Sequence, residues 1–129
     1  AIAHGLPGDA TEAAVIDLAQ RGELFVGTYD REGSVWQRRG ELTIEAAEHW
    51  AVQRSISRRI VGPGLARLRG STFPAEICFP AEFDIPQARH VAAIGQRQLE
   101  QGIISDCWSL EPFYLRRSAA EEKAGVKVV

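Results

Sequence analysis

Residues 13–42 read AAVIDLAQRGELFVGTYDREGSVWQRRGEL, and this stretch decides the fold. It opens with a nearly continuous apolar run at 13–18, which favours a strand covered on both faces. Residues 23–29 alternate between two sets of side chains and include aromatic and branched residues, as a second strand would. Residues 30–33 are typical of a hairpin loop, and the more polar residues 35–42 predict the returning strand. The stretch therefore predicts a three-stranded antiparallel meander.

Helices and short strands are predicted to alternate after the meander. Thr43 is placed to cap a helix, and residues 59–62 and 77–79 predict short strands. Residues 86–101 carry the clearest helical periodicity, with Asp84 or its neighbour as the predicted cap. This order indicates the α/β class, and it is typical of a ribonuclease-H-like or actin-like ATPase lobe.

The apolar positions of these elements predict the core. Near the end of the chain, Pro112 fixes a backbone dihedral and favours an extended segment. We expect Tyr114 to be buried there with its hydroxyl hydrogen-bonded, so that the segment holds the last helix on the domain. The predicted core residues are Val15, Ile16, Leu24, Val26, Ile60, Val61, Ile77, Val91, Ala92 and Leu99.

Composition indicates one domain. The chain has 129 residues, of which 1–117 are expected to form the domain and 118–129 a polar, flexible tail. A net charge of −2 and a pI near 5.9 argue against an autonomous nucleic-acid-binding domain. Cys78 and Cys107 match no metal or redox spacing, and free thiols in a reducing cytoplasm are the expectation. No apolar stretch approaches the length that spans a bilayer.

Five arginines fall within a short central stretch. A solvated, arginine-rich surface is the interpretation that we favour, and a contact surface for RNA phosphates or for an acidic partner is the alternative. These candidate interaction residues are Arg54, Arg58, Arg59, Arg67 and Arg69.

The motifs of common catalytic and metal sites are missing from the sequence. His4, His49 and His90 are far apart and do not form a paired-histidine metal motif. Cys107 lies in no recognised nucleophile arrangement. The acids Asp17, Glu23, Asp30 and Glu32 gather near one hairpin, where solvated turn residues are the expectation. We therefore predict no catalytic residue and no metal site.

Five segments, in order, resemble one protein family. Residues 2–8 (IAHGLPG) resemble the end of a helix that closes a preceding lobe, while 14–17 (AVID) and 22–25 (GELF) resemble the family's hairpin. Residues 61–64 (VGPG) are similar to its Val-Gly-x-Gly loop, and 111–116 (EPFYLR) to its terminal Pro-x-Tyr-Leu-Arg. Together they resemble the C-terminal half of TsaB-type (YeaZ-like) proteins of the glycoprotease-like family.

The resemblance implies a structural and a functional role. The chain would be the second of two actin-like lobes, as a fragment that lacks the N-terminal lobe and its Asp-Thr-Ser strand. It would act without catalysis as a scaffold in the modification of tRNA to N6-threonylcarbamoyladenosine at position 37. The implied partners are a TsaD-like catalytic paralogue and a TsaE-like ATPase, with tRNA contacted only indirectly, and a homodimer is left open.

The implied complex uses ATP, although we expect this chain alone to carry no cofactor. Glycine turns of the second lobe approach the nucleotide in actin-like folds, so Gly62 and Gly64 are the candidate cofactor-binding residues. A backbone turn that needs glycine is the alternative. The alternative functions are a glycoprotease-like hydrolase and a ribonuclease-H-like binding module with another partner.

Overall fold

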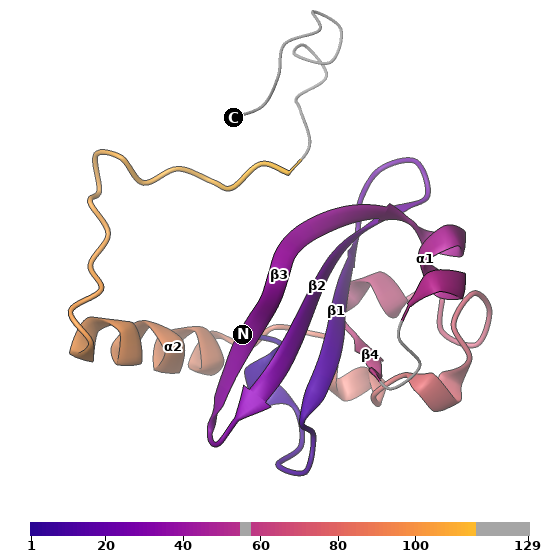
Figure 1. Cartoon of the computed structure of the whole chain (residues 1–129), viewed down its shortest axis with the longest axis horizontal. Helices are drawn as coiled ribbons and strands as arrows, with labels where there is room; N and C mark the ends of the chain where they lie inside the picture. The colour runs from indigo at the N-terminus through magenta and orange to yellow at the C-terminus, as the bar shows by residue number, and fades with distance from the viewer. Residues whose placement is uncertain (55–57, 116–129) are drawn as a thin grey trace, which may run out of the picture.

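The computed structural model describes residues 1–54 and 58–115 (Figure 1). Within these ranges the chain is an α/β protein with a mixed four-stranded sheet and two α-helices. The predicted tail at 118–129 lies outside the described residues. The sheet has the strand order β3-β2-β1-β4. Its strands are β1 (Glu12–Leu18), β2 (Glu23–Glu32), β3 (Val35–Ala46) and β4 (Ile60–Val61).

The predicted meander is confirmed, because β2 pairs antiparallel with both β1 and β3. The predicted loop at 30–33 is wrong in extent, since both strands continue to a tight turn at Gly33 and Ser34. Gly33 has a φ of 63°, which suits such a turn. Arg39 on β3 holds this end of the hairpin closed through ion pairs with Asp30 and Glu32 on β2.

Helix α1 (Ala47–Gln53) forms, but the predicted cap at Thr43 is wrong. Thr43 and Ile44 still pair with β2, and β3 runs on to Ala46. Pairing with β2 therefore keeps this stretch extended, and the helix begins only where the pairing stops.

The prediction of a strand at 59–62 is confirmed as β4, which runs parallel to β1. The predicted strand at 77–79 is reduced to a single parallel bridge between Ile60 and Cys78. Phe79 donates its backbone N–H to the carbonyl of Ile60 at 2.8 Å. A 3-10 turn over Ala75–Ile77 directly precedes this bridge, so the extended segment is too short for a strand.

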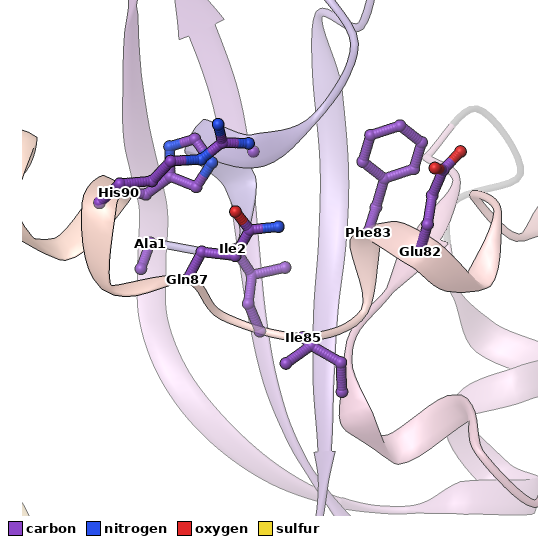
Figure 2. A pocket seen from close by; sticks show the side chains of 9 residues that line it. Ala1, Ile2, Glu82, Phe83, Ile85, Gln87 and His90 are labelled. Carbon is purple, nitrogen blue, oxygen red and sulfur yellow. The ribbon is translucent and has the colours of Figure 1, made fainter.

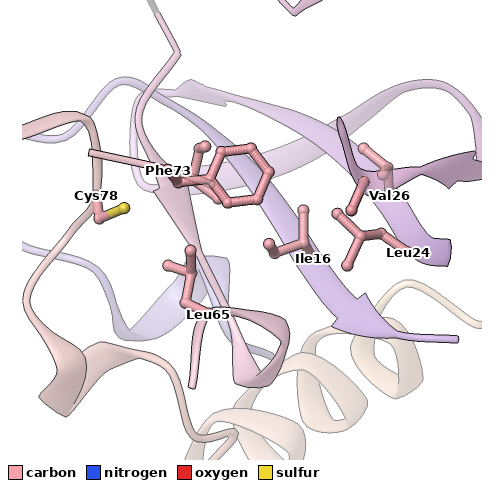
Figure 3. Close-up of a cluster of buried hydrophobic side chains, with 8 residues drawn as sticks. Ile16, Leu24, Val26, Leu65, Phe73 and Cys78 are labelled. Carbon is pink, nitrogen blue, oxygen red and sulfur yellow. The ribbon is translucent and has the colours of Figure 1, made fainter. Parts of the chain in front are cut away.

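Two apolar clusters form the core, one on each face of the sheet. Figure 3 shows the first, in which side chains of β1 and β2 meet Leu65, Phe73 and Cys78. The second packs Trp36 and Phe79 against the N-terminal segment. The predicted core residues that the structure confirms as buried are Ile16, Leu24, Val26, Ile60 and Val61. Val15 and Ile77 are half-buried.

The predicted C-terminal helix is confirmed as α2 (Ala88–Glu100), but its predicted core face is wrong. Val91, Ala92 and Leu99 are exposed, with 56% of Val91 and 63% of Leu99 accessible to solvent. The half-buried positions of the helix are instead His90, Ile94 and Arg97. The apolar stripe has no element opposite it in the described part of the chain.

The predicted burial of Tyr114 is also wrong, because Tyr114 is 66% exposed and Phe113 is 75% exposed. The chain after α2 rises from the far end of the helix and turns back as an extended segment (Figure 1), and residues 101–114 are all exposed. This segment therefore does not hold α2 on the domain. Among the described residues, no helix combines the length and the apolar character needed to cross a membrane.

Candidate functional site

The loop from Gly62 to Gly64 leaves β4 and lies directly against β1. Gly62 has a φ of 130°, and a Cβ atom there would lie 2.1 Å from the carbonyl oxygen of Ile16. A Cβ atom on Gly64 would lie 3.1 Å from the Cα atom of Asp17. Both glycines thus allow two backbones to approach closely, which explains the Gly-x-Gly pattern structurally. The nucleotide contact predicted for Gly62 and Gly64 stays a prediction.

Asp84 ties this loop to the segment that follows it. This carboxylate is buried, and its Oδ1 atom accepts the backbone N–H of Gly62 at 2.9 Å. Its Oδ2 atom accepts a hydrogen bond from Nη2 of Arg69 at 2.5 Å. Nη1 of Arg69 also donates to the carbonyl oxygen of Phe79. The group therefore neutralises a buried charge and links the stretch 62–69 to the stretch 79–84.

The role of Asp84 was missed from the sequence, where it was interpreted as a helix cap. Gln87 is the residue that precedes α2, and it makes no side-chain capping bond. No local signal distinguishes Asp84 from Glu82, an acid two residues earlier that is exposed.

Replacing Asp84 with alanine should destabilise the protein by about 2–4 kcal/mol, because Arg69 and the N–H of Gly62 would lose their partner. Urea unfolding followed by circular dichroism measures this loss. The control is Asp106→Ala, since Asp106 is exposed and its bonds are local. Equal midpoints for both variants would show that the buried pair contributes little.

The other arginines of the central stretch also contact their own chain. Arg58 reaches across to β2 and forms an ion pair with Asp30 at 2.9 Å. Arg59 places its guanidinium 4.3 Å from the ring centroid of Phe79 and donates to the carbonyl of Cys78.

Arg54 donates to the backbone carbonyl of Arg58 at 2.6 Å, and burial lowers the pKa of Arg54. Arg67 is exposed. The five arginines thus divide into four that make contacts within the fold and Arg67. The contact with RNA phosphates or an acidic partner stays a prediction.

A hollow of about 190 Å³ lies between the N-terminal segment and the start of α2 (Figure 2). Glu82, Phe83, Gln87 and His90 are among the residues that line it. A neighbouring hollow of about 220 Å³ is lined by His4 and by residues of β2, β3 and α2. Ala1 lines both hollows, and α2 contributes residues to each of them.

His4 and His90, which are far apart in sequence, are brought near each other by the contact between α2 and the domain. The Nε2 atom of His4 is buried and has no hydrogen-bond partner among the residues that the structure describes. Burial lowers the pKa of His4, and the positive charges of the N-terminal ammonium, Arg97 and His90 act in the same direction. The hollows offer imidazole and guanidinium groups, but the described ranges contain no cluster of three or more histidines, cysteines or acids that could hold a metal ion.

The two cysteines differ in environment. Cys78 is buried, and burial raises the pKa of its thiol, whereas Cys107 is exposed. We expect a thiol reagent at neutral pH to modify Cys107 rapidly and Cys78 only after unfolding, because the thiolate is the reactive form. Mass spectrometry of the singly labelled protein locates the label. Equal labelling of both residues in the folded protein would contradict this expectation.

Three segments of the family resemblance lie together in the structure. Residues 14–17 pair with 22–25 in the antiparallel ladder, and Val15 pairs with Val61 in the parallel one. Gly64 packs on Asp17. Residues 111–115 are not part of this group. Neither a scan against models of protein families nor a search of curated proteins found a match to this chain.

Proposed function

We propose that this chain is the C-terminal lobe of a TsaB-type protein, with a ribonuclease-H-like, actin-like fold. The observation that carries the proposal is the strand order β3-β2-β1-β4, with β4 parallel to β1. The segment at Cys78 continues this order with a parallel bridge on the far side of β4. The three-stranded meander is followed by a helix, and the later extended segments then join the sheet in parallel on the β1 side. This arrangement supports the lobe architecture.

The proposed role is that of a scaffold without catalytic activity in a cytoplasmic complex that makes N6-threonylcarbamoyladenosine at position 37 of tRNA. The catalytic partner is a TsaD-type subunit, a TsaE-type ATPase is the second partner, and ATP is used by the complex rather than by this lobe. The adjacency of residues 14–17, 22–25 and 61–64 supports this proposal, because three segments of the family pattern converge on one region of the sheet.

Arg67 is the member of the arginine-rich stretch that we propose for contact with an acidic surface of a partner. Its side chain is exposed, whereas Arg58, Arg59 and Arg69 donate to groups of their own chain. An exposed arginine at the rim of an interface affects the association rate and its dependence on salt. The charge reversal Arg67→Glu should therefore slow association without unfolding the lobe.

Reconstitution tests the function. The gene product that contains this chain is combined with the TsaD-type and TsaE-type proteins of the same organism, the enzyme that makes the threonylcarbamoyl donor, ATP and tRNA. Modified adenosine is then measured by mass spectrometry. We expect modification only when the protein is present. The variant Arg69→Ala removes the partner of the buried Asp84. Circular dichroism shows separately whether this variant has lost its fold.

The alternatives give different results. Hydrolysis of peptides or ATP by the purified protein alone would favour the hydrolase, and capture of an unrelated partner without tRNA modification would favour the general binding module. Unchanged modification in the absence of the protein would contradict the scaffold role.

A further inference from the structure

The hollow of about 220 Å³ is built by three parts of the chain that are distant in sequence. The N-terminal segment supplies His4, the meander supplies Tyr29 and Trp36, and α2 supplies Ile94 and Arg97. Trp36 is buried in the second core cluster, and Tyr29 packs against that cluster. The aromatic walls of the hollow are therefore held by the sheet, and its shape is largely formed before anything binds.

Arg97 brings a cation to this hollow that no acid of the described chain neutralises. Its side chain is half-buried. Within residues 1–54 and 58–115, its guanidinium takes part in no ion pair and no hydrogen bond. Partial burial of a cation carries a desolvation cost that an anion would offset. The paired N–H donors of a guanidinium match the two oxygens of a carboxylate, so Arg97 offers an open position for one.

His4 supplies the second polar group of the hollow. Its Nε2 atom is buried without a partner in the part of the chain that the structure describes, whereas most buried polar atoms have one. Burial lowers the pKa of His4 most, and the remaining contributions come from the N-terminal ammonium, Arg97 and His90, all of them positive. A hydrogen-bonding anion would therefore satisfy the nitrogen and offset the repulsion between these groups.

The size and the lining of the hollow restrict the ligand. Its volume equals that of roughly seven water molecules in the liquid, and it is smaller than the roughly 300 Å³ at which drug-sized sites begin. Apart from Arg97 and His4, much of the wall is aromatic or aliphatic, from Tyr29, Trp36 and Ile94. A bare phosphate ion would leave these walls without a contact. A carboxylate on a single ring provides both a charged group and an apolar body.

We propose that this hollow is a binding site for a small aromatic carboxylate, which pairs with Arg97. Nε2 of His4 donates a second hydrogen bond to the carboxylate, and the ring lies against Trp36 and Tyr29. Such a ligand contacts α2, the N-terminal segment and the sheet together, and it stabilises the contact between α2 and the domain. The site uses none of the residues that we assign to a protein partner, so this proposal and the scaffold role are tested separately.

Titration calorimetry of the 129-residue chain with benzoate tests the proposal. We expect saturable binding with a dissociation constant of about 1 mM or below, as fits a ligand of roughly ten non-hydrogen atoms. Benzamide, which has the same shape without the charge, and inorganic phosphate, which has the charge without the ring, should each bind at least tenfold more weakly.

Arginine variants locate the site. Arg97→Gln should weaken benzoate binding more than tenfold, and Arg97→Lys should weaken it less, because lysine keeps the charge but not the paired donors. The matched control is Arg89→Gln, which should bind benzoate as the wild-type chain does. Arg89 is an exposed arginine of the same helix, and it lines the other hollow.

The imidazole of His4 gives a second readout by NMR. The titratable and charged groups around it are His90 and Arg97 of α2, Tyr29 of β2 and the N-terminal ammonium. A bound carboxylate favours the protonated imidazole, so the pKa of His4 should rise when benzoate saturates the chain. Benzoate binding should therefore tighten as the pH falls from about 8 to about 6. His49, which is exposed on α1, should keep its pKa and serves as the internal control.

Several results would overturn the proposal. One is the lack of saturable binding to the folded chain at benzoate concentrations up to about 20 mM. Others are equally tight binding of benzamide or phosphate, and benzoate binding that a folded Arg97→Gln variant leaves unchanged. A saturated chain in which the pKa of His4 does not move would also contradict it. This last measurement uses the wild-type chain, so it decides the matter even if Arg97→Gln fails to fold.

Discussion

Replacing Gly62 with alanine should destabilise the protein by at least ~3 kcal/mol, a large share of the stability of a small domain. Its φ of 130° lies in a region that residues with a side chain rarely adopt. The added Cβ would also lie 2.1 Å from the carbonyl oxygen of Ile16, which belongs to the central strand pairing and has little freedom to move. The loop would have to leave β1, and the bond from Gly62 to Asp84 would break.

Urea unfolding monitored by circular dichroism measures this effect. Gly95→Ala is the matched control, since a Cβ there meets open space within α2. That control should stabilise the helix by about 0.5–1 kcal/mol. If Gly62→Ala unfolded at the same urea concentration as the wild-type chain, the close approach of the loop to β1 would be wrong.

Replacing Phe73 with alanine should cost about 3–5 kcal/mol. Phe73 is fully buried, and its ring packs edge-on against Trp50 with 5.6 Å between the ring centroids. It fills the space between α1 and the sheet, so truncation leaves a cavity that a short helix and a paired sheet cannot close.

Thermal and urea unfolding of Phe73→Ala should be compared with Phe113→Ala, which removes the same side chain from a site that is 75% exposed. Because its side chain is exposed, Phe113→Ala should change stability by no more than about 0.5 kcal/mol. Similar losses for both variants would mean that Phe113 is buried and that the first core cluster is less central than described.

The meander was predictable because its signal is local. Alternation in β2 and the apolar run in β1 place the same residues in the core whatever lies further along the chain, and Ile16, Leu24 and Val26 are buried as expected. The start of α1 was not predictable from Thr43, because strand pairing overrides a capping preference.

The apolar stripe of α2 shows the limit of periodicity. The pattern correctly predicts a helix, but it cannot say whether another element lies against the stripe of Val91 and Leu99. Tyr114 fails for the same reason. Burial depends on what faces a side chain, and in the described chain nothing faces these residues.

The buried pair of Asp84 and Arg69 depends on tertiary structure alone. The two residues are separated in sequence and meet only because the loop after β4 folds back over β1. In the sequence, Arg69 belonged to a charged stretch that usually indicates a solvated surface. Its pairing with a carboxylate from another segment has no local signature.

The most direct test of the proposed scaffold role is a calorimetric titration of this chain with the TsaD-type subunit of the same organism. We expect saturable binding of one lobe per TsaD-type subunit with a dissociation constant in the micromolar range or below, weakened by Arg67→Glu and not by Val52→Ser. No binding at concentrations up to about 100 μM, with both proteins folded, would contradict the assignment of this chain to a TsaB-type scaffold.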